Sequence, residues 1–371
     1  MSARDWAELL RVSALFTVPG DALAGAAASG LRPNRRTLLA IGSSLCLYEA
    51  GMALNDWADR AEDAIDRPHR PLPSGRIAPG AALAAAGGLT VAGLALAARA
   101  GRPAQAVAGA LAASVWSYDL GLKRTALGPA AMATARSLDL LLGATATGGR
   151  ARTALPSAAL LGAHTLAVTS VSRHETQGGS VAVPVGALAA TVVLGELLGR
   201  PRTAGPGSRP GRDGLDGLDG LDGGGEGDVA GVGGDRPGTG VSWAGAGKTW
   251  SALGGGPHGA GKGRPGVAAR EGGTGVGHRV RNGGAGLGVR GLPRPASLLA
   301  AAYVATAAKP LFHAALNPSP PLTQRAVGGG IRAMIPLQAA LAARTGALGT
   351  ALATAALAPL ARRFGRKVSV T

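Results

Sequence analysis

Aromatic residues are scarce in this sequence, and cysteine is almost absent. The 371 residues include three Phe, three Tyr and five Trp, and Cys46 is the single cysteine. One cysteine excludes an intrachain disulfide, so cysteine usage does not indicate the redox compartment. The formal net charge is +17, but the basic residues occur in short connecting segments and the tail without aromatic residues between them. This pattern argues against nucleic-acid binding and fits contact with anionic lipid head groups.

Charged residues are also few, at 16% of the chain against 46% apolar residues. Apolar runs of about 20 residues recur, and each is long enough to cross the hydrocarbon core of a bilayer as a helix. The run at 81–98 is apolar on every side, unlike the striped helices of soluble proteins. We predict an all-α, multispan transmembrane bundle of nine or ten helices around a central cavity. The helices are expected at about 9–29, 37–57, 79–100, 104–121, 126–148, 154–172, 181–199, 296–316, 325–344 and 347–361.

The stretch 200–295 breaks this pattern. It consists mostly of Gly with Arg, Asp, Pro and Thr, and has too few large apolar residues to offset the entropy of ordering the chain. We therefore predict three parts: helices one to seven at 1–199, a disordered insertion at 200–295, and the remaining helices with a basic tail at 296–371.

An acidic motif follows directly on the apolar run 38–54. Asn55, Asp59 and Asp63 are four residues apart, which places their side chains on one face of a helix. Oxygen ligands at a helix end suit Mg²⁺, which prefers a few carboxylates together with phosphate oxygens. Arg67 and Arg70 come next, in a Pro-rich turn that cannot continue the helix. The alternative is a solvated helix end capped by charges.

The stretch resembles the first Asp-rich motif of the UbiA superfamily of intramembrane prenyltransferases, Asn-x-x-x-Asp-x-x-x-Asp followed by Arg-Pro-x-Arg-Pro-Leu-Pro-Ser-Gly. The resemblance implies a nine-helix fold that holds Mg²⁺ and transfers a prenyl group from an allylic prenyl diphosphate to an aromatic or other hydrophobic acceptor. Metal ligands would be Asn55, Asp59 and Asp63.

Two further places match the superfamily less closely. Relatives carry a Tyr and a diphosphate-binding Lys after the fourth helix, and Tyr118 and Lys123 stand there, five residues apart. An interfacial Tyr and a snorkelling Lys are the alternative. Many relatives have a second Asp-rich motif after the sixth helix, where this chain has Ser172-Arg173-His174-Glu175. We expect Arg173 to replace part of the metal charge there.

The resemblance therefore implies a catalytic set and a binding set. The catalytic candidates are Asp59, Asp63, Lys123 and Arg173, and the substrate-binding candidates are Asn55, Arg67, Arg70, Tyr118 and Glu175.

Three charged residues fall inside apolar runs. Asp21 faces either a cavity or partner, or a local break near water. Arg136 and Asp139 are three residues apart, so they either neutralise each other or face the cavity.

Two other functions stay open. A CDP-alcohol phosphotransferase needs Asp-x-x-Asp-Gly, but Arg60 follows Asp56-x-x-Asp59 here. A non-catalytic membrane binder or transporter would explain the altered second motif.

The expected surroundings are the lipid bilayer, and no obligate protein partner or nucleic acid is indicated. The basic tail favours the cell membrane with the acidic motif facing the cytoplasm. Three arginines would then lie on the outer side of the membrane, although Lys and Arg are usually enriched on the cytoplasmic side: Arg32, Arg35 and Arg36.

Overall fold

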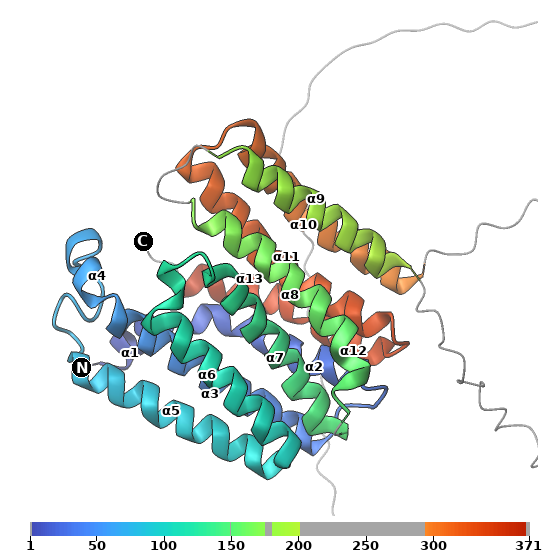
Figure 1. Cartoon of the computed structure of the whole chain (residues 1–371), viewed down its shortest axis with the longest axis horizontal. Coiled ribbons are helices and arrows are strands. Elements are labelled where there is room, and N and C mark those ends of the chain that lie inside the picture. The colour runs from blue at the N-terminus through green and yellow to red at the C-terminus, as the bar shows by residue number, and fades with distance from the viewer. Residues whose placement is uncertain (1, 149, 175–179, 201–293, 369–371) are drawn as a thin grey trace, which may run out of the picture. The chain divides into compact units, whose positions relative to one another are not determined.

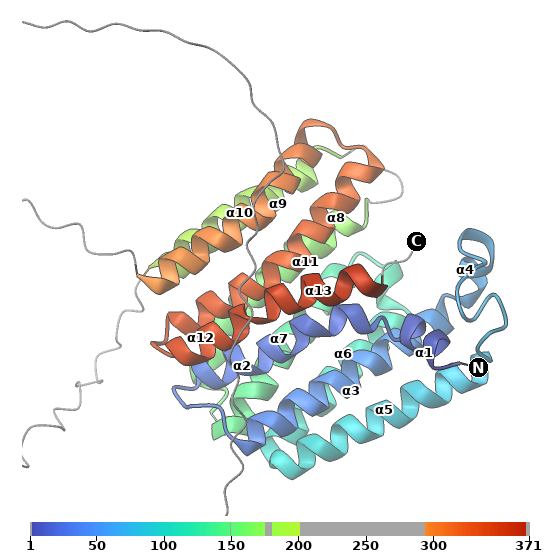
Figure 2. The same ribbon diagram turned by 180° about the vertical axis from the view of Figure 1, so that it is seen from behind.

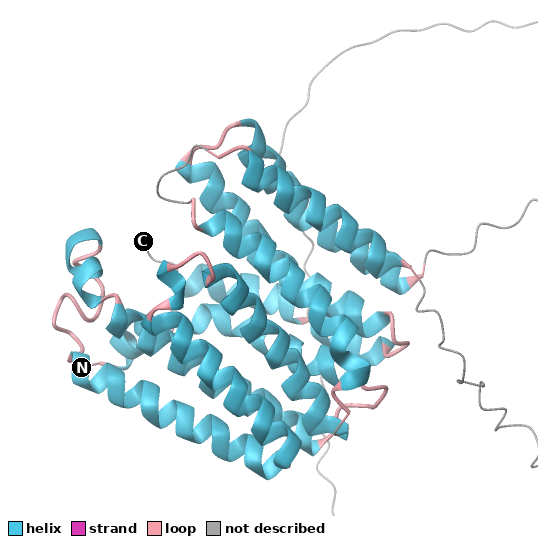
Figure 3. Ribbon diagram, viewed as in Figure 1, coloured by secondary structure: helices cyan, strands magenta, loops and turns pink. Residues whose placement is uncertain are grey.

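A computed structural model describes residues 2–148, 150–174, 180–200 and 294–368. Within these ranges the regular structure is entirely helical, as Figure 3 shows. The α-helices are α1 (Ala3–Leu9), α2 (Val18–Ala28), α3 (Arg35–Ala58), α4 (Arg60–Asp66), α5 (Pro79–Ala100), α6 (Arg102–Leu120), α7 (Gly128–Gly148), α8 (Leu155–Ser172), α9 (Ala182–Gly199), α10 (Pro295–Leu316), α11 (Pro320–Ala343), α12 (Leu348–Ala355) and α13 (Leu357–Val368). Three short 3₁₀ helices accompany them: η1 (Val12–Thr17), η2 (Leu122–Arg124) and η3 (Arg152–Ala154).

The long helices lie as roughly parallel rods (Figures 1 and 2). Helix α7 is central and packs against α2, α3, α6 and α8, while α3 also packs on α5. On the other side, α10 packs between α9 and α11. The all-α prediction is confirmed for the described residues, and most of the 200–295 insertion and Glu175 lie outside them.

Six helical segments of the described chain are long and apolar enough to span a membrane: Arg35–Ala58, Pro79–Ala100, Arg152–Ser172, Ala182–Gly199, Pro295–Leu316 and Pro320–Ala343. The sequence predicts nine or ten spans. Helices α2, α6 and α7 correspond to predicted spans but are not both long and apolar enough to count among these six. Helix α2 has only 11 residues, and α6 and α7 carry polar side chains that line an internal cavity.

The first and last predicted helices are each divided. Arg11 adopts a left-handed backbone conformation with φ of 49°, and the chain then forms η1 before α2 begins. Pro19 fits in the first turn of α2, where no backbone N–H donor is needed. Near the C-terminus, Pro359 lies in the first turn of α13, so the run at 347–361 separates into α12 and α13.

A buried polar cluster joins four helices. Arg136 of α7 lies 3.0 Å from the Asp21 carboxylate of α2, and Gln338 of α11 donates to the other Asp21 oxygen at 2.6 Å. Ser44 of α3 donates to Asp139 of α7. These five residues are called the polar floor below. Asp21 is fully buried, so the alternative that placed it at a local helix break near water is wrong. Arg136 pairs with Asp21 and not with Asp139.

Helices α2 and α7 approach closely through glycine. A Cβ on Gly143 would overlap the backbone of Ala22, and a Cβ on Gly25 would overlap the Leu140 carbonyl. Small residues at such contacts let membrane helices pack backbone to backbone. Because the polar floor joins the same two helices, this close contact also fixes the distance between Asp21 and Arg136.

Gly143→Ala is therefore expected to destabilise the bundle, by about 1–3 kcal/mol for an overpacked site. The matched control is Gly88→Ala on α5, where an added Cβ meets nothing within 4 Å. Thermal unfolding of both variants in the same detergent, followed by size-exclusion chromatography, measures the difference. Equal stability of the two variants would contradict the close α2–α7 contact.

Candidate functional site

The acidic motif lies where α3 ends and α4 begins. Asp59 sits between the helices with φ of −91° and ψ of 5°, outside the α-helical range. The helical hydrogen bonds continue across it, because the Asp59 amide donates to the Asn55 carbonyl at 2.9 Å and the Asp63 amide to the Asp59 carbonyl at 2.8 Å. The chain therefore bends at Asp59 and keeps the four-residue spacing. Arg67 follows α4 as its C-cap, before Pro68, so the helix ends where the sequence predicts.

One group of charges forms around Asp59. The Lys123 ammonium lies 2.7 Å from the Asp59 carboxylate and donates to the side-chain oxygen of Asn55 at 3.1 Å. Arg124 joins this carboxylate at 3.1 Å and also lies 3.1 Å from Glu62. The structure thus brings together three predicted site residues, Asn55, Asp59 and Lys123, and adds Arg124, which the sequence did not single out.

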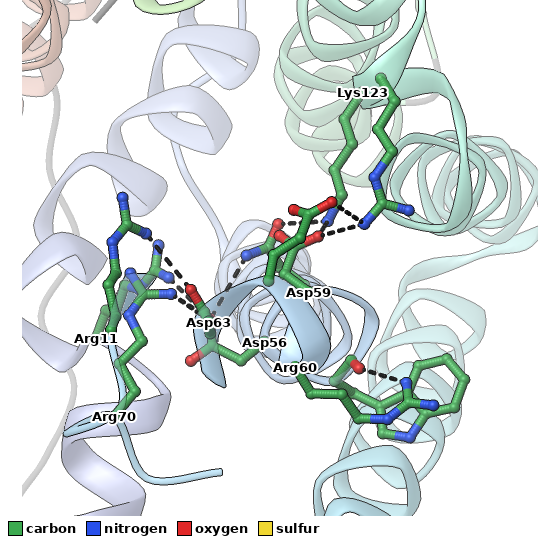
Figure 4. Close-up of polar contacts among 12 residues, drawn as sticks. Arg11, Asp56, Asp59, Arg60, Asp63, Arg70 and Lys123 are labelled. Atoms are coloured by element: carbon green, nitrogen blue, oxygen red, sulfur yellow. Dashed lines mark hydrogen bonds and ion pairs between the residues drawn. The ribbon is translucent and has the colours of Figure 1, made fainter. Parts of the chain in front are cut away.

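A second group forms around Asp63 and Asp56, as Figure 4 shows. Arg70 lies 2.7 Å from Asp63 and 3.6 Å from Asp56, and Arg67 lies 3.7 Å from Asp63. Arg11 reaches Asp56 at 2.9 Å. Asp59 and Asp63 therefore have different cationic partners, although they share one helical face. Arg11 is 45 residues from Asp56 in sequence, which explains why no local pattern predicts it.

The oxygens of Asn55 and Asp59 converge on one positive charge, the Lys123 ammonium. The position of this ammonium shows that both oxygens can bind a single cation placed between them. Among the described residues, no three His, Cys, Asp or Glu side chains gather as a ready metal cluster. This donor set fits Mg²⁺, because that ion is commonly held by one or two carboxylates and completed by waters and substrate phosphates.

The remaining predicted residues are Tyr118, Arg173 and Glu175. Tyr118 lines a cavity of about 260 Å³ between α3, α6 and α7. Arg173 is exposed at the end of α8 and donates to the Thr125 carbonyl, two residues beyond Lys123. Tyr118 lies within electrostatic reach of Arg173 and Asp59. The structure therefore places Arg173 beside the Lys123 turn, while Glu175 lies outside the described residues.

The cavity is polar at both ends and apolar between them. Its mouth includes Arg11, Asn55, Tyr118 and Asp119, and its far end includes three residues of the polar floor. The remaining lining is mostly apolar and consists of Leu47, Tyr48, Gly51, Met52, Leu111, Val115, Met132 and Ala135. Asp119 was not among the predicted site residues, although it is 4% exposed and lies at the end of α6, just before the turn that carries Lys123.

An N-terminal clamp closes against the motif's tail. Arg76 lies 2.9 Å from Asp5 and 2.7 Å from Glu8, and it donates to the His69 carbonyl at 2.7 Å. The guanidinium thereby joins α1 to the turn that follows α4. Hydrogen bonds from Ser2, and then Arg76, lower the pKa of Asp5 from 3.8 to about 2, and Arg76 lowers the pKa of Glu8.

Tryptophans surround the same end of the bundle. Trp6, Trp57 and Trp116 pack against one apolar cluster between α1, α3 and α5, and the Arg60 guanidinium stacks over the Trp57 ring at 4.7 Å. Tryptophan is enriched at the level of lipid head groups. The acidic motif therefore lies at the depth expected of a membrane surface.

Comparison with known families identifies one matching region. Residues 13–193 match the family model of the UbiA prenyltransferase family. This region contains the acidic motif, Lys123 and Arg173.

Three curated relatives are each named digeranylgeranylglyceryl phosphate synthase. The chain is 38% identical to the Methanothrix thermoacetophila protein over 88 residues, which is 23% of this chain and 33% of that protein. It is 34% identical to the Methanopyrus kandleri protein over 116 residues, 31% of this chain and 41% of that one. The Ignicoccus hospitalis protein is 32% identical over 145 residues, 39% of this chain and 48% of that one. The matches thus span half or less of each relative.

Two solved structures are also similar. One belongs to work on digeranylgeranylglyceryl phosphate synthase in membranes, with 21% identity, a TM-score of 0.43 and coverage of 52% of this chain and 75% of that one. The other is an apo UbiA homologue from Aeropyrum pernix K1, with 21% identity, a TM-score of 0.41 and coverage of 49% and 74%.

The clamp predicts a pH dependence for α1. Because the pKa values of Asp5 and Glu8 are lowered in the folded state, their contribution is complete above their ordinary values of 3.8 and 4.5. It is lost as the pH falls toward about 2, where Asp5 becomes protonated. Hydrogen exchange of residues 3–9, corrected for the intrinsic pH dependence, should speed up in that window.

Arg76→Gln should produce the same faster exchange at pH 7, because it removes the shared cation. Arg4→Gln on α1 is the matched control, since Arg4 forms none of the clamp contacts. Full protection of residues 3–9 in Arg76→Gln would show that apolar packing alone holds the helix.

Proposed function

Because residues 13–193 match the model of the UbiA prenyltransferase family, we propose that this chain belongs to that family and transfers a prenyl group from an allylic diphosphate to a hydrophobic acceptor within the membrane. The observation that carries this proposal is the arrangement at the cavity mouth. Asn55 and Asp59 converge on one cation there, and Arg11 lines the same opening. An anion and a divalent cation would both find ligands at that point.

Asn55, Asp59 and Asp63 would hold Mg²⁺, which when bound would neutralise the diphosphate as it leaves. Without a ligand, Lys123 and Arg124 already neutralise Asp59, and Arg70 and Arg67 neutralise Asp63. A divalent ion alone would add uncompensated positive charge to this site. A complex of the ion with diphosphate would add almost none, so the two should bind together.

The basic residues have a second task. Lys123, Arg70 and Arg11 donate to carboxylates in the structure, and phosphate oxygens are alternative acceptors for the same donors. A diphosphate at the mouth would therefore accept charge-assisted hydrogen bonds from these basic side chains. The carboxylates that they leave would bind the metal instead. Arg and Lys at this position stabilise charge that grows as the bond between C1 and the diphosphate oxygen breaks.

The cavity walls protect the product of that cleavage. Departure of the diphosphate leaves an allylic cation that water would quench. Leu47, Val115 and Met132 are among the apolar side chains that line the space below the mouth and exclude water from it. The acceptor would then attack C1 and form the new bond, and a proton lost by the acceptor would pass to the departed diphosphate, which is the base that this step supplies.

Charge distribution supports an orientation in the cell membrane. Helix α13, whose sequence includes Arg362, Arg363, Arg366 and Lys367, packs against η1, which directly follows Arg11 at the mouth. Basic segments favour the cytoplasmic side. We therefore propose that the mouth faces the cytoplasm.

Asp59→Asn and Asp63→Asn should each remove prenyl transfer almost completely while membrane insertion stays normal. Asp66→Asn is the matched control, because Asp66 is an exposed acid at the end of the same short helix. The assay incubates purified protein in nanodiscs with Mg²⁺, labelled geranyl, farnesyl or geranylgeranyl diphosphate and a cell lipid extract. Mg²⁺-dependent binding without any product would indicate a binding protein instead of a transferase.

Arg173→Gln should weaken diphosphate binding by about 1 kcal/mol, or roughly fivefold in Kd, because an exposed charge contact is screened by solvent. The exposure of Arg173 places the expected effect well below that of a desolvated pair. Arg152→Gln, an exposed arginine near the opposite end of α8, is the control. Unchanged affinity in Arg173→Gln, measured across a Mg²⁺ titration, would make this arginine a neighbour of the site only.

A further inference from the structure

The cavity beneath the mouth has a closed and rigid far end. Ser44, Arg136 and Asp139 line that end. Behind them Arg136 is paired with Asp21 at 3.0 Å, and Gln338 donates to Asp21 at 2.6 Å. The polar floor thus connects α2, α3, α7 and α11.

This floor resists displacement. Asp21 and Gln338 are fully buried, and Asp139 is 5% exposed. Separating such a pair would leave an unpaired charge in a low-dielectric interior, which is strongly unfavourable. The close glycine contact between α2 and α7 adds a second restraint directly beside it. A ligand that enters from the mouth therefore meets a fixed end, not a wall that can open.

The distance from mouth to floor follows from α3. Asn55 at the mouth and Ser44 at the floor are eleven residues apart on this helix, which corresponds to about 16 Å at 1.5 Å per residue. An extended carbon chain advances about 1.2 Å per bond. One carbon of each five-carbon prenyl unit is a branch methyl, so a ten-carbon prenyl chain reaches about 8 Å from C1, a fifteen-carbon chain about 13 Å, and a twenty-carbon chain about 18 Å.

We infer that this chain selects a short allylic diphosphate of ten to fifteen carbons and rejects the twenty-carbon donor, with the polar floor setting the limit. The inference rests on the proposed function, because it places the diphosphate at the mouth and the tail in the cavity. Ser44 and Asp139 are then specificity-determining residues that contact the tail end and take no part in bond cleavage.

The test measures Mg²⁺-dependent binding of geranyl, farnesyl and geranylgeranyl diphosphates to the full chain in nanodiscs, together with transfer of each. We expect geranyl or farnesyl diphosphate to bind at least tenfold more tightly than geranylgeranyl diphosphate. Equal or tighter binding of the twenty-carbon donor would overturn the inference and leave the proposed function standing. Absence of Mg²⁺-dependent binding for all three would remove the proposed function and the inference with it.

A variant that shortens the cavity gives an independent result. Ala135 lines the wall of the cavity on α7, and Ala135→Leu should lower binding of farnesyl diphosphate relative to geranyl diphosphate by about tenfold. Ala130→Leu, on the exposed side of the same helix, is the matched control and should keep the wild-type ratio. An unchanged ratio in folded Ala135→Leu would show that the tail lies elsewhere, and the wild-type donor series decides the question if that variant does not fold.

Discussion

A charge beside hydrocarbon is costly unless an opposite charge or a hydrogen bond compensates it, and both polar regions of this bundle are organised by that constraint. At the mouth, Asp59 and Asp63 each lie against two basic side chains. At the floor, one guanidinium serves the buried Asp21 carboxylate, and a hydroxyl serves Asp139. The apolar walls of the cavity lie between these two polar regions.

The same constraint shapes what the mouth can bind. Its carboxylates are already neutralised without ligand, so binding is an exchange in which existing partners are replaced. The free energy of such an exchange is the difference between two sets of contacts. A ligand that brings both signs of charge disturbs this balance least. Under the proposed function, this arrangement would favour a metal–anion pair over a free metal or a neutral lipid.

Much of the fold and part of the site could be predicted from the sequence. Long apolar runs located the helices, because hydrophobic length is a local property. The spacing of Asn55, Asp59 and Asp63 identified a candidate site, and the structure brings Asn55 and Asp59 together at Lys123. The bend at Asp59 was not predictable from that spacing. The contact of Arg11 with Asp56 and that of Asp21 with Arg136 were missed because each joins distant segments. Local spacing instead suggested the pair Arg136 and Asp139, which share one face of α7 yet take separate partners.

The polar floor also constrains how the protein is made. Asp21 and Gln338 are 317 residues apart, so α2 is synthesised long before its partner on α11 exists. A carboxylate held near the middle of a bilayer without a partner costs about 3 kcal/mol on the translocon scale. Helix α2, with 11 residues, is too short to offset this cost alone. Stable insertion of the first apolar segment therefore has to wait for α7, and the bundle closes only when nearly the whole chain has left the ribosome.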